Sequence, residues 1–517
     1  MAGSSTPRAD SLWWRGGTIR AVGTFADIRA AAAVAGEPPP VLIELPDALV
    51  TPGFVDGHTH FAEWALGRGR VDLAGCRTRA EAIARIRDAG SGSEPGDGWV
   101  LGQGYDPNGW EAPPTRDALD RVLPDLPAAF DSHDVHALWA NSAALARAGI
   151  GRDTPDPEGG RIVRDAAGEA TGLLLEHAVR LVHRVVPRPP ADRVLEAVRA
   201  AQGAAHRLGV TGIQNVEGRE ALTAFQRLEQ AGALRLRVLA HLPADGLDAA
   251  LTLGVRSGGG SEWLVTGGVK LFLDGALGSQ TAWMLEPYEG SLERGIVLTE
   301  EPRARDALTR AAQGGIAATV HAIGDAAVRR ALDILASLPV AAIPHRIEHF
   351  QLVHPDDRTR AARAGIVASM QPAHLLTDIP LVDRHWGARG AGAYAFRTLL
   401  DAATTLVFGS DVPVETIDPR DGVYAALVRS GRDGEPRGGW RAAERLTFAE
   451  TLRAYTAAAW AAAGRAGRGG MLDPGQAADL VAWSAPAGDA PAGDGGAFRA
   501  ARAVLTVAGG EVVWRES

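Results

Sequence analysis

The sequence is short of cysteine, of long apolar runs and of basic charge, and each shortage excludes a class of protein. Its single cysteine, Cys76, cannot form an internal disulfide. No apolar run approaches the roughly 18 residues of a membrane-spanning helix, which excludes an integral membrane protein. The formal net charge of −9 offers no basic excess for nucleic acid or an anionic membrane. We therefore expect a small-molecule partner, with no nucleic-acid or membrane partner.

The start of the chain also lacks the positively charged segment and apolar run of a secretory signal peptide, so we expect a cytoplasmic protein. Hydrophobic residues at 46% and charged residues at 22% are close to globular averages. A length of 517 residues allows one large α/β barrel with a smaller domain, or two to three ordinary domains.

Both ends of the chain resemble short strands separated by turns. At the start these are 11–17, 18–23 and 41–54, with the proline-rich EPPP segment (37–40) between the last two. At the end, the strand segment 474–485 and a Gly/Ala/Pro/Asp-rich loop (486–496) precede a hairpin that turns at Gly509-Gly510. Neither end is stable alone, so we expect 1–53 and 468–517 to form one small β-sandwich.

Between the ends, short apolar runs alternate with Ala/Leu/Arg-rich stretches of helical period, such as 191–209 and 304–315. Eight runs are candidate strands: 53–60, 210–216, 234–243, 267–275, 315–325, 345–353, 365–374 and 404–411. This pattern predicts an α/β fold with a (β/α)8 barrel over 54–467, and an open doubly wound sheet is the alternative. The gap from 61 to 209 is too long for one crossover. We therefore expect an insertion or lid at about 65–190, after the first strand.

Two histidines end the first predicted strand. His58 and His60 are two residues apart, so on a strand both imidazoles point to the same side and can hold one metal ion. The pair alone fits equally well two hydrogen-bonded histidines near a turn.

A lysine lies inside the fourth predicted strand, where its neighbours are apolar. A buried ammonium is costly, so Lys270 requires an explanation. One explanation is an ion pair with Asp274 or another carboxylate. The other is a lowered pKa, which would let the neutral amine react with carbon dioxide to give a metal-bridging carbamate.

Three further polar residues end predicted strands: His321, His349 and Asp411. Each alone could be structural, since a hydrogen-bonded histidine or a helix N-cap would explain it. Together with His58, His60 and Lys270 they lie on one face of one barrel, where barrel enzymes place functional groups. Imidazole and carboxylate ligands without thiolates suit zinc, manganese or iron(II).

The segments GFVDGHTH, VKLFLDGALGSQTA, VHAIGD, RIEHFQ and FGSDVP resemble the amidohydrolase superfamily, in particular the amidohydrolase family 3 branch of N-substituted formamide deformylase-like enzymes. The resemblance covers nearly the whole chain. It implies two divalent metal ions, most commonly Zn²⁺, with Mn²⁺ or Fe²⁺ as alternatives. His58 and His60 would hold the more buried ion, His321 and His349 the more exposed one, and carbamylated Lys270 would bridge both. Asp411 would bind the first ion and act as the base.

The sequence departs from the group at three positions. Relatives often read Asp-Gly-Ser-Leu-Gly-Ser-Arg after the lysine strand, whereas this chain has Ala276 and Gln280. Asn215 stands where relatives commonly have Asp. None of these is an expected ligand, but loss of the Arg would alter recognition of an anionic or strongly polar group.

The expected reaction is hydrolysis of a non-peptide C–N bond. Two ions sharing a water would lower its pKa to about 7 and supply hydroxide, and Asp411 would take the proton and return it to the leaving nitrogen. His136 would either donate to the oxyanion or order the insertion. Expected substrate contacts, which imply an apolar or aromatic portion, are Trp64, Tyr105, Trp110, His136, Trp139, Asp274, Gln280, Trp283 and Phe350.

Linear amides are the substrates that we expect first, and cyclic amides, carbamates and esters are the alternatives. The competing hypotheses are a mononuclear deaminase or isomerase with an ordinary Lys270 amine, and a catalytically silent barrel that binds metal or ligand. The complete six-residue set argues against the silent barrel. Group members are frequently dimeric, which makes a homodimer one expectation, although no stripe of residues identifies an interface.

Overall fold

Eight parallel strands form the central sheet of the computed structural model, which describes residues 9–34, 41–90, 98–484 and 495–516. Segments 37–40 and 486–494 lie outside the described residues. Each strand overlaps its predicted range, so the predicted α/β barrel is confirmed. In spatial order the strands are β4 (Phe54–Thr59), β11 (Val210–Asn215), β12 (Arg237–Pro243), β13 (Leu264–Phe272), β14 (Ala318–Ala322), β15 (Arg346–His349), β16 (Val367–Met370) and β17 (Leu406–Phe408).

The barrel is closed by backbone hydrogen bonds between the end of its first strand and the segment that follows its last strand. Just beyond β17, the Asp411 amide donates to the His58 carbonyl, and the His60 amide donates to the Val412 carbonyl, both at 2.8 Å. Glycine permits this approach, because a Cβ at Gly57 would overlap the Val407 side chain and lie 2.8 Å from the Phe408 carbonyl oxygen. The seam that closes the barrel therefore places Asp411 beside both histidines of the first strand.

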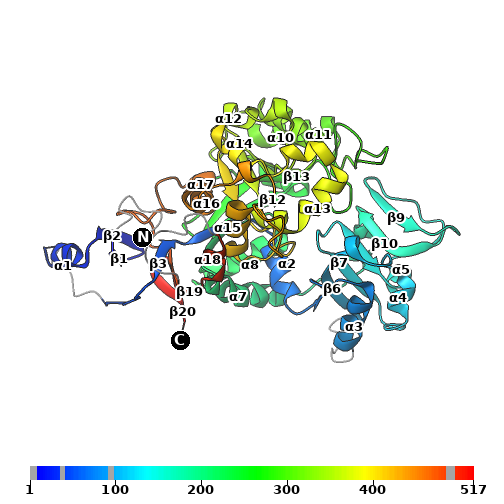
Figure 1. The fold of residues 1–517 in the computed structure, drawn as a ribbon, viewed down its shortest axis with the longest axis horizontal. Helices are drawn as coiled ribbons and strands as arrows, with labels where there is room; N and C mark the ends of the chain where they lie inside the picture. Colours follow the sequence, from blue (N-terminus) through cyan, green and yellow to red (C-terminus); the bar gives the residue numbers. More distant parts are fainter. Residues whose placement is uncertain (1–8, 35–40, 91–97, 485–494, 517) are drawn as a thin grey trace.

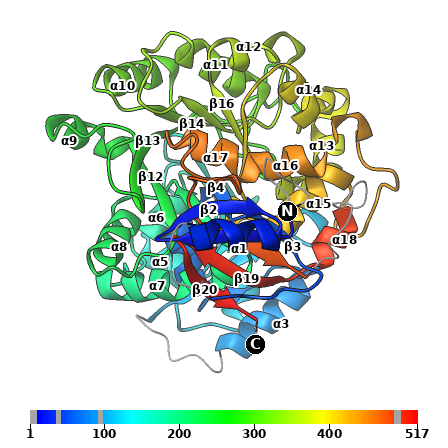
Figure 2. The same cartoon turned by 90° about the vertical axis from the view of Figure 1, so that its left-hand side faces the viewer.

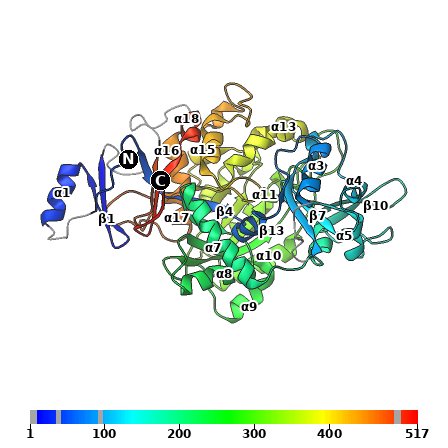
Figure 3. The ribbon, with the colours of Figure 1, turned by 90° about the horizontal axis from the view of Figure 1, so that it is seen from below.

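Helices cover the outside of the barrel, and none of the described helices is long and apolar enough to cross a bilayer. Helix α8 illustrates their pattern, since its buried residues Ala221, Ala224, Phe225 and Leu228 repeat at helical spacing. Figure 3 shows α7 and α8 side by side, and they pack against β11 and β12. The covering helices are α7 (Ala191–Arg207), α8 (Arg219–Gln230), α9 (Leu247–Thr252), α10 (Glu301–Gln313), α11 (Asp325–Leu335), α12 (Arg360–Arg363), α13 (Leu375–His385), α14 (Phe396–Asp401), α15 (Pro419–Val428), α16 (Phe448–Tyr455) and α17 (Ala457–Ala462).

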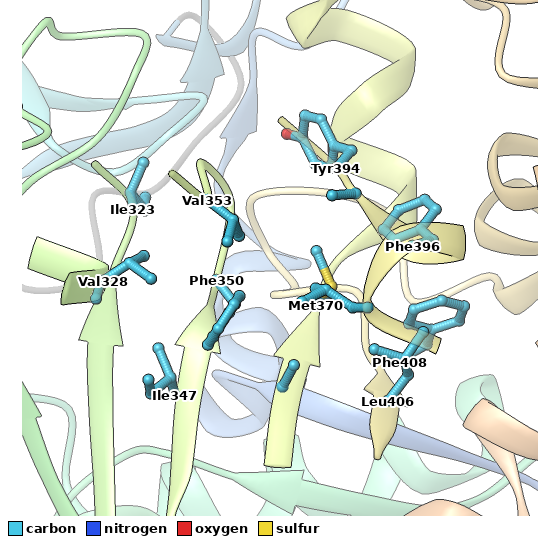
Figure 4. Packing of buried hydrophobic residues seen from close by; sticks show 14 of the residues in the cluster. Ile323, Val328, Ile347, Phe350, Val353, Met370, Tyr394, Phe396, Leu406 and Phe408 are labelled. Carbon is cyan, nitrogen blue, oxygen red and sulfur yellow. The ribbon is translucent and has the colours of Figure 1, made fainter. Parts of the chain in front are cut away.

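The largest apolar core lies between the second half of the barrel and its helices. Figure 4 shows Phe350 beside Ile347 and Val353, with Met370 and Phe408 on the neighbouring strands. All five side chains are buried. The strands that carry the candidate site therefore stand on a packed support rather than around an open pore.

A six-stranded sheet follows the first barrel strand and occupies the expected place of the insertion. Helix α2 (Phe61–Gly67) leads into this sheet. Figure 1 shows the sheet at the opposite end of the long axis from the chain termini. Its spatial order is β5 (Val71–Asp72), β6 (Val100–Tyr105), β7 (Ala128–Ser132), β8 (Ala137–Ala140), β10 (Ala170–Glu176) and β9 (Gly160–Arg164). Helices α3 (Arg79–Gly90), α4 (Arg116–Asp120) and α5 (Ser142–Arg147) connect its strands, and α6 (Val179–His183) follows its last strand.

The two ends of the chain meet in two small sheets (Figure 2). Apolar residues from both ends form one cluster, which includes Ile19, Leu480 and Leu505. The predicted hairpin at Gly509-Gly510 is confirmed. The sheets consist of β1 (Ser11–Arg15) with β2 (Thr18–Gly23), and of β20 (Glu511–Arg515), β19 (Ala503–Ala508), β18 (Leu480–Trp483) and β3 (Leu49–Pro52), with helix α18 (Gly495–Ala500) before β19.

One element at the start of the chain differs from the predicted strands. Residues Phe25–Val34 form helix α1, and within the expected strand 41–54 the residues Leu49–Pro52 form β3, while Phe54 already begins β4. The helix is explained by its alanine-rich sequence and by Thr24, whose Oγ1 accepts the Asp27 amide at 3.2 Å and donates to the Asp27 carboxylate at 2.6 Å.

Candidate metal centre and substrate cavity

Asp411 lies at the centre of a group of histidines at the carboxyl end of the barrel. Its Oδ1 is 3.2 Å from His58 Nε2 and 3.5 Å from His60 Nε2, and its Oδ2 is 4.0 Å from His349 Nδ1. Ligand atoms of His58, His349 and Asp411 all lie within 4.8 Å of one another, a spacing that can hold a metal ion. His58 is buried, whereas 23% of the His60 side chain is exposed, so His60 faces the open side.

The backbone is strained at two of these positions. Asp411 has φ 60° and His349 has φ 69°, a left-handed conformation that costs a non-glycine residue of order 1–3 kcal/mol. Burial acts to raise the pKa of Asp411, but the neighbouring histidines, first of all His58, hold it well below its usual range. Asp411 is therefore an ionised carboxylate aimed at imidazole nitrogens.

A buried carboxylate orients His58 from behind, and it was not among the residues that we predicted. Glu348 Oε2 accepts a short hydrogen bond from His58 Nδ1 and is itself paired with Arg346. Burial opposes ionisation of Glu348, but Arg346 and then His58 hold its pKa well below the usual range. His58 Nε2 is therefore left to face Asp411, which is the arrangement of a histidine prepared for a metal.

Lys270 is buried without a partner. Its side chain is 3% exposed, and Nζ has no hydrogen-bond partner among the described residues. Nζ lies 4.7 Å from the centre of the Phe272 ring, and burial lowers its pKa to about 8. The alternative of an ion pair with Asp274 is not formed, because the Asp274 carboxylate instead accepts the backbone amides of Trp283, Ile323 and Gly324.

His321 and His349 approach each other on neighbouring strands, with ring centroids 4.4 Å apart. Nδ1 of each ring is buried and has no hydrogen-bond partner among the described residues. Together with Lys270 Nζ, three buried nitrogens near the Asp411 carboxylate therefore lack a hydrogen-bond partner among the described residues. Buried polar atoms are rarely left unpaired, so the donor set fits divalent metal ions held by imidazole and carboxylate.

His136 belongs to the insertion and lies over the barrel site. It follows β7, and its ring centroid is 5.9 Å from that of His321. Its Nδ1 is 2.8 Å from Glu176 Oε2. Although burial acts to lower it, Glu176 raises the pKa of His136 to about 9, so the imidazole is protonated at neutral pH.

A cavity of about 210 Å³ lies between the insertion and the barrel, and Asp411, His349 and His136 line it. Of the expected substrate contacts, only Tyr105 and His136 are among the lining residues. The structure places the others outside the lining. Four tryptophans and one phenylalanine serve packing: Trp139 and Phe350 are buried in apolar clusters, Trp110 donates to the Cys76 carbonyl, Trp64 packs on Phe61, and Trp283 packs against the large core. The side chain of Gln280 is exposed, and the Asp274 carboxylate accepts backbone amides.

The position of Asn215 has a similar explanation. Its side-chain oxygen accepts the backbone amide of Phe61 at 3.1 Å, at the start of α2. Asn215 therefore supports the backbone that follows the two metal-binding candidates of β4, and it is not among the residues that line the cavity.

Among the lining residues that sequence reasoning missed are His374 and Asp378, in the 3-10 turn and the helix after β16. His374 Nε2 is 3.8 Å from Asp411 Oδ2. A signal was available, because His374 ends the seventh predicted strand segment just as His349 and Asp411 lie at the ends of theirs. Asp378 carries no such signal, since a carboxylate inside a helix is ordinarily solvated.

Comparison with known proteins agrees with this arrangement. The model of the amidohydrolase family matches residues 41–514. The chain belongs to the amidohydrolase family. This amidohydrolase is 30% identical to putative amidohydrolase YtcJ of Bacillus subtilis (strain 168), over 99% of this chain and 97% of the relative. It is 28% identical to N-substituted formamide deformylase of Arthrobacter pascens, over 92% and 89% of the two chains.

A solved structure extends the likeness to the whole fold. An uncharacterized metal-dependent hydrolase from Pyrococcus horikoshii OT3 superposes with a TM-score of 0.74 at 26% identity, covering 91% of this chain and 92% of that chain. Family and structural neighbour together support a metal-dependent hydrolase with a candidate metal site at the barrel mouth.

Proposed function

We propose that this amidohydrolase hydrolyses a linear, non-peptide amide, of the N-formyl or N-acyl amine type, at a centre of two divalent metal ions. The observation that carries the proposal is the set of unpartnered nitrogens around Asp411, on Lys270, His321 and His349. His58, His60 and Asp411 would hold one ion, and His321 and His349 the other, with Zn²⁺ preferred by the ligand set. When bound, such ions lower the pKa of water and polarise a carbonyl group.

Lys270 supplies the bridge in this scheme. Its amine, with a pKa of about 8, is partly neutral near physiological pH and can add to carbon dioxide with loss of one proton. The product is a carbamate, whose two oxygens carry one negative charge. This would replace a buried, unpaired ammonium by an anion among positive ions, which removes the electrostatic cost of burying Lys270.

Asp411 holds and moves the proton. Its carboxylate is ionised and lines the cavity, so it can accept a proton from water as the C–O bond forms. The C–N bond then breaks with its electron pair on nitrogen, and the proton passes from Asp411 to that nitrogen. Balanced with water, the products are a carboxylate and an ammonium ion.

His136 is the proposed donor to the carbonyl oxygen. Glu176 holds it and favours its protonated form, and it lines the same cavity as Asp411. A fixed cationic donor stabilises negative charge that develops on oxygen. The same residue belongs to the insertion, so the insertion would take part in the reaction.

The cavity favours a small molecule with an apolar portion. Its polar groups lie beside apolar side chains from the insertion, among them Leu173 and Leu175, and from the barrel side, among them Leu277. The relative named N-substituted formamide deformylase supports formamides as first substrates to test.

Metal removal and restoration test the proposal. We expect the purified protein to hydrolyse an N-substituted formamide, to lose activity on chelation, and to regain it with Zn²⁺ or Mn²⁺ in bicarbonate buffer. Metal content measured alongside should rise toward two ions per chain. Turnover that survives complete chelation, or a metal-loaded protein inactive on formamides, N-acyl amines and esters alike, would contradict the proposal.

A further inference from the structure

The start of α13 presents two polar side chains to the cavity that the chemistry described above does not use. His374 and Asp378 are four residues apart, so they lie one helical turn apart on the same side. Both line the cavity together with Asp411. They therefore face a substrate from the barrel side, close to the group that moves the proton.

His374 has a nitrogen prepared for a ligand. Its Nε2 is buried and has no hydrogen-bond partner among the described residues, and it is 3.8 Å from Asp411 Oδ2. That separation is too long for a direct hydrogen bond. It is short enough for one substrate atom in the cavity to lie within hydrogen-bond distance of both groups.

Asp378 is held in place from behind. Its Oδ2 accepts the Tyr394 hydroxyl at 2.5 Å and the Gln351 side-chain amide at 2.9 Å. Among the described residues no hydrogen bond ends on Oδ1. The carboxylate is thus fixed through one oxygen, which leaves the other to accept a donor from the cavity.

The rest of the lining indicates which kind of group binds here. The lining residues include the carboxylates of Asp106 and Asp134 but no Lys or Arg. Ala276 and Gln280 add no cation on the loop after the lysine strand, and Gln280 does not reach the cavity. Apart from the proposed metal ions and His136, the lining therefore supplies acceptors and no further cation, which suits N–H donors and ammonium groups.

We propose that His374 and Asp378 form the subsite of the leaving amine, so that the substrates are secondary amides whose N–H is donated to this pair. The inference rests on the proposed function, since the leaving nitrogen is the atom that Asp411 protonates. The same subsite holds the product as a primary ammonium ion. Tertiary amides and esters of equal shape lack the donor and leave both acceptors unpaired, which costs affinity in the transition state.

Three matched compounds test the pair: N-(2-phenylethyl)formamide, its N-methyl derivative and 2-phenylethyl formate. In wild type we expect kcat/KM to be highest for the secondary amide relative to the uncatalysed rate of each compound. Asp378→Asn turns an NH₂ toward the cavity while its oxygen keeps Tyr394 and Gln351. It should lower kcat/KM for the secondary amide about 10- to 100-fold and change the other two less than about threefold.

His374→Leu should show the same selectivity, and Asp383→Asn provides the matched control. Asp383 lies on the same helix but contacts Trp440 and Arg441 outside the cavity. We expect this control to behave as wild type with all three compounds. Equal losses on amide and ester in Asp378→Asn and His374→Leu, or no loss in either, would overturn the subsite.

Product binding separates the subsite from the proposed function. Calorimetry on zinc-loaded protein should show 2-phenylethylamine binding at least tenfold more tightly than 2-phenylethanol, with the preference lost in Asp378→Asn but kept in Asp383→Asn. If wild type cleaves none of the compounds yet shows this preference, the proposed function fails, and His374 and Asp378 remain an ammonium-binding site without a leaving-group role. If it cleaves the secondary amide but binds amine and alcohol alike in every variant, the subsite is wrong.

Discussion

His58 and Glu348 form a buried pair in which the Glu348 carboxylate accepts a hydrogen bond from Nδ1 of the imidazole. Burial and Lys270 act to lower the pKa of His58, but Asp411 and Glu348 raise it above its usual value. Because Glu348 holds Nδ1, the nitrogen left for a metal is Nε2, which faces Asp411 at 3.2 Å. Arg346 fixes Glu348 in turn. The barrel interior therefore orients the ring of a candidate metal ligand before any metal binds.

Replacing this carboxylate should weaken metal binding. We expect Glu348→Gln to lower zinc affinity about 10- to 100-fold, because the amide no longer fixes the His58 tautomer. Competition with a chromophoric chelator measures the affinity. Glu450→Gln on α16 is the control, since Glu450 pairs with Arg397 away from the cavity. We expect the zinc affinity of this variant to equal that of wild type. Equal affinities in all three proteins would show that Glu348 does not prepare the ligand.

Asp411→Asn should lower kcat for a secondary amide by about 10²- to 10⁴-fold, since an amide side chain cannot take the proton from water. The asparagine keeps the size of the side chain and the backbone bond to His58, so we expect the unfolding temperature to stay close to that of wild type. Steady-state kinetics and a thermal melt check the two parts. A kcat within threefold of wild type would remove Asp411 from the proton transfer.

The His136–Glu176 pair should make stability depend on pH. The pKa of His136 is raised from 6.5 to about 9, so its stabilising contribution is complete below pH 6.5 and is lost as pH rises through about 9. The pKa of Glu176 is lowered, so its contribution is present above 4.5 and is lost as pH falls below that value. For metal-free protein, the difference in free energy of unfolding between wild type and Glu176→Gln should shrink by on the order of 2 kcal/mol from pH 6.5 to 9.

Denaturant melts of the chelated wild type and Glu176→Gln across that range give the difference directly. Metal-free protein is the right sample, because a cation bound at His321 would itself lower the pKa of His136. A difference that stays constant or grows between pH 6.5 and 9 would show that the pair is not charged as described.

The barrel seam should tolerate no side chain at Gly57. A Cβ there would overlap Val407 and approach the Phe408 carbonyl oxygen at 2.8 Å, so Gly57→Ala should destabilise the fold by about 1–3 kcal/mol and lower metal content. Gly203→Ala on α7 is the matched control, because nothing lies within 4 Å of its Cβ position. We expect this control to be as stable as wild type or up to about 1 kcal/mol more stable. If Gly57→Ala retained as much metal as wild type, the close approach at Gly57 would not be needed to position the metal ligands.

The barrel could be predicted from the sequence because its strands are short apolar runs separated by helices of clear period. The polar residues that end those runs converge for the same reason, since parallel strands bring their carboxyl ends to one face. Helix α1 was missed because the alanine-rich stretch between the predicted strands 18–23 and 41–54 was assigned no element of its own. The aromatic residues were harder, since a tryptophan such as Trp139 has the same sequence signal whether it packs in a core or lines a cavity.

Residues that contact a candidate metal ligand without being ligands themselves could not be predicted either. Glu348 looks like any polar residue next to a histidine, and only the register of β15 beside β14 turns it toward His58. Asp378 depends on the path of the chain after β16, which no periodicity specifies, whereas His374 ends a predicted strand segment and carried a signal that was overlooked.

The central claim is that His58, His60, Lys270, His321, His349 and Asp411 together hold two metal ions. A crystal structure of zinc-loaded protein prepared with bicarbonate, with anomalous data collected at the zinc edge, tests it most directly. The account predicts two anomalous peaks within reach of these side chains and additional density for a carbamate on Lys270 Nζ. A single peak, or none, together with an unmodified Lys270, would contradict it.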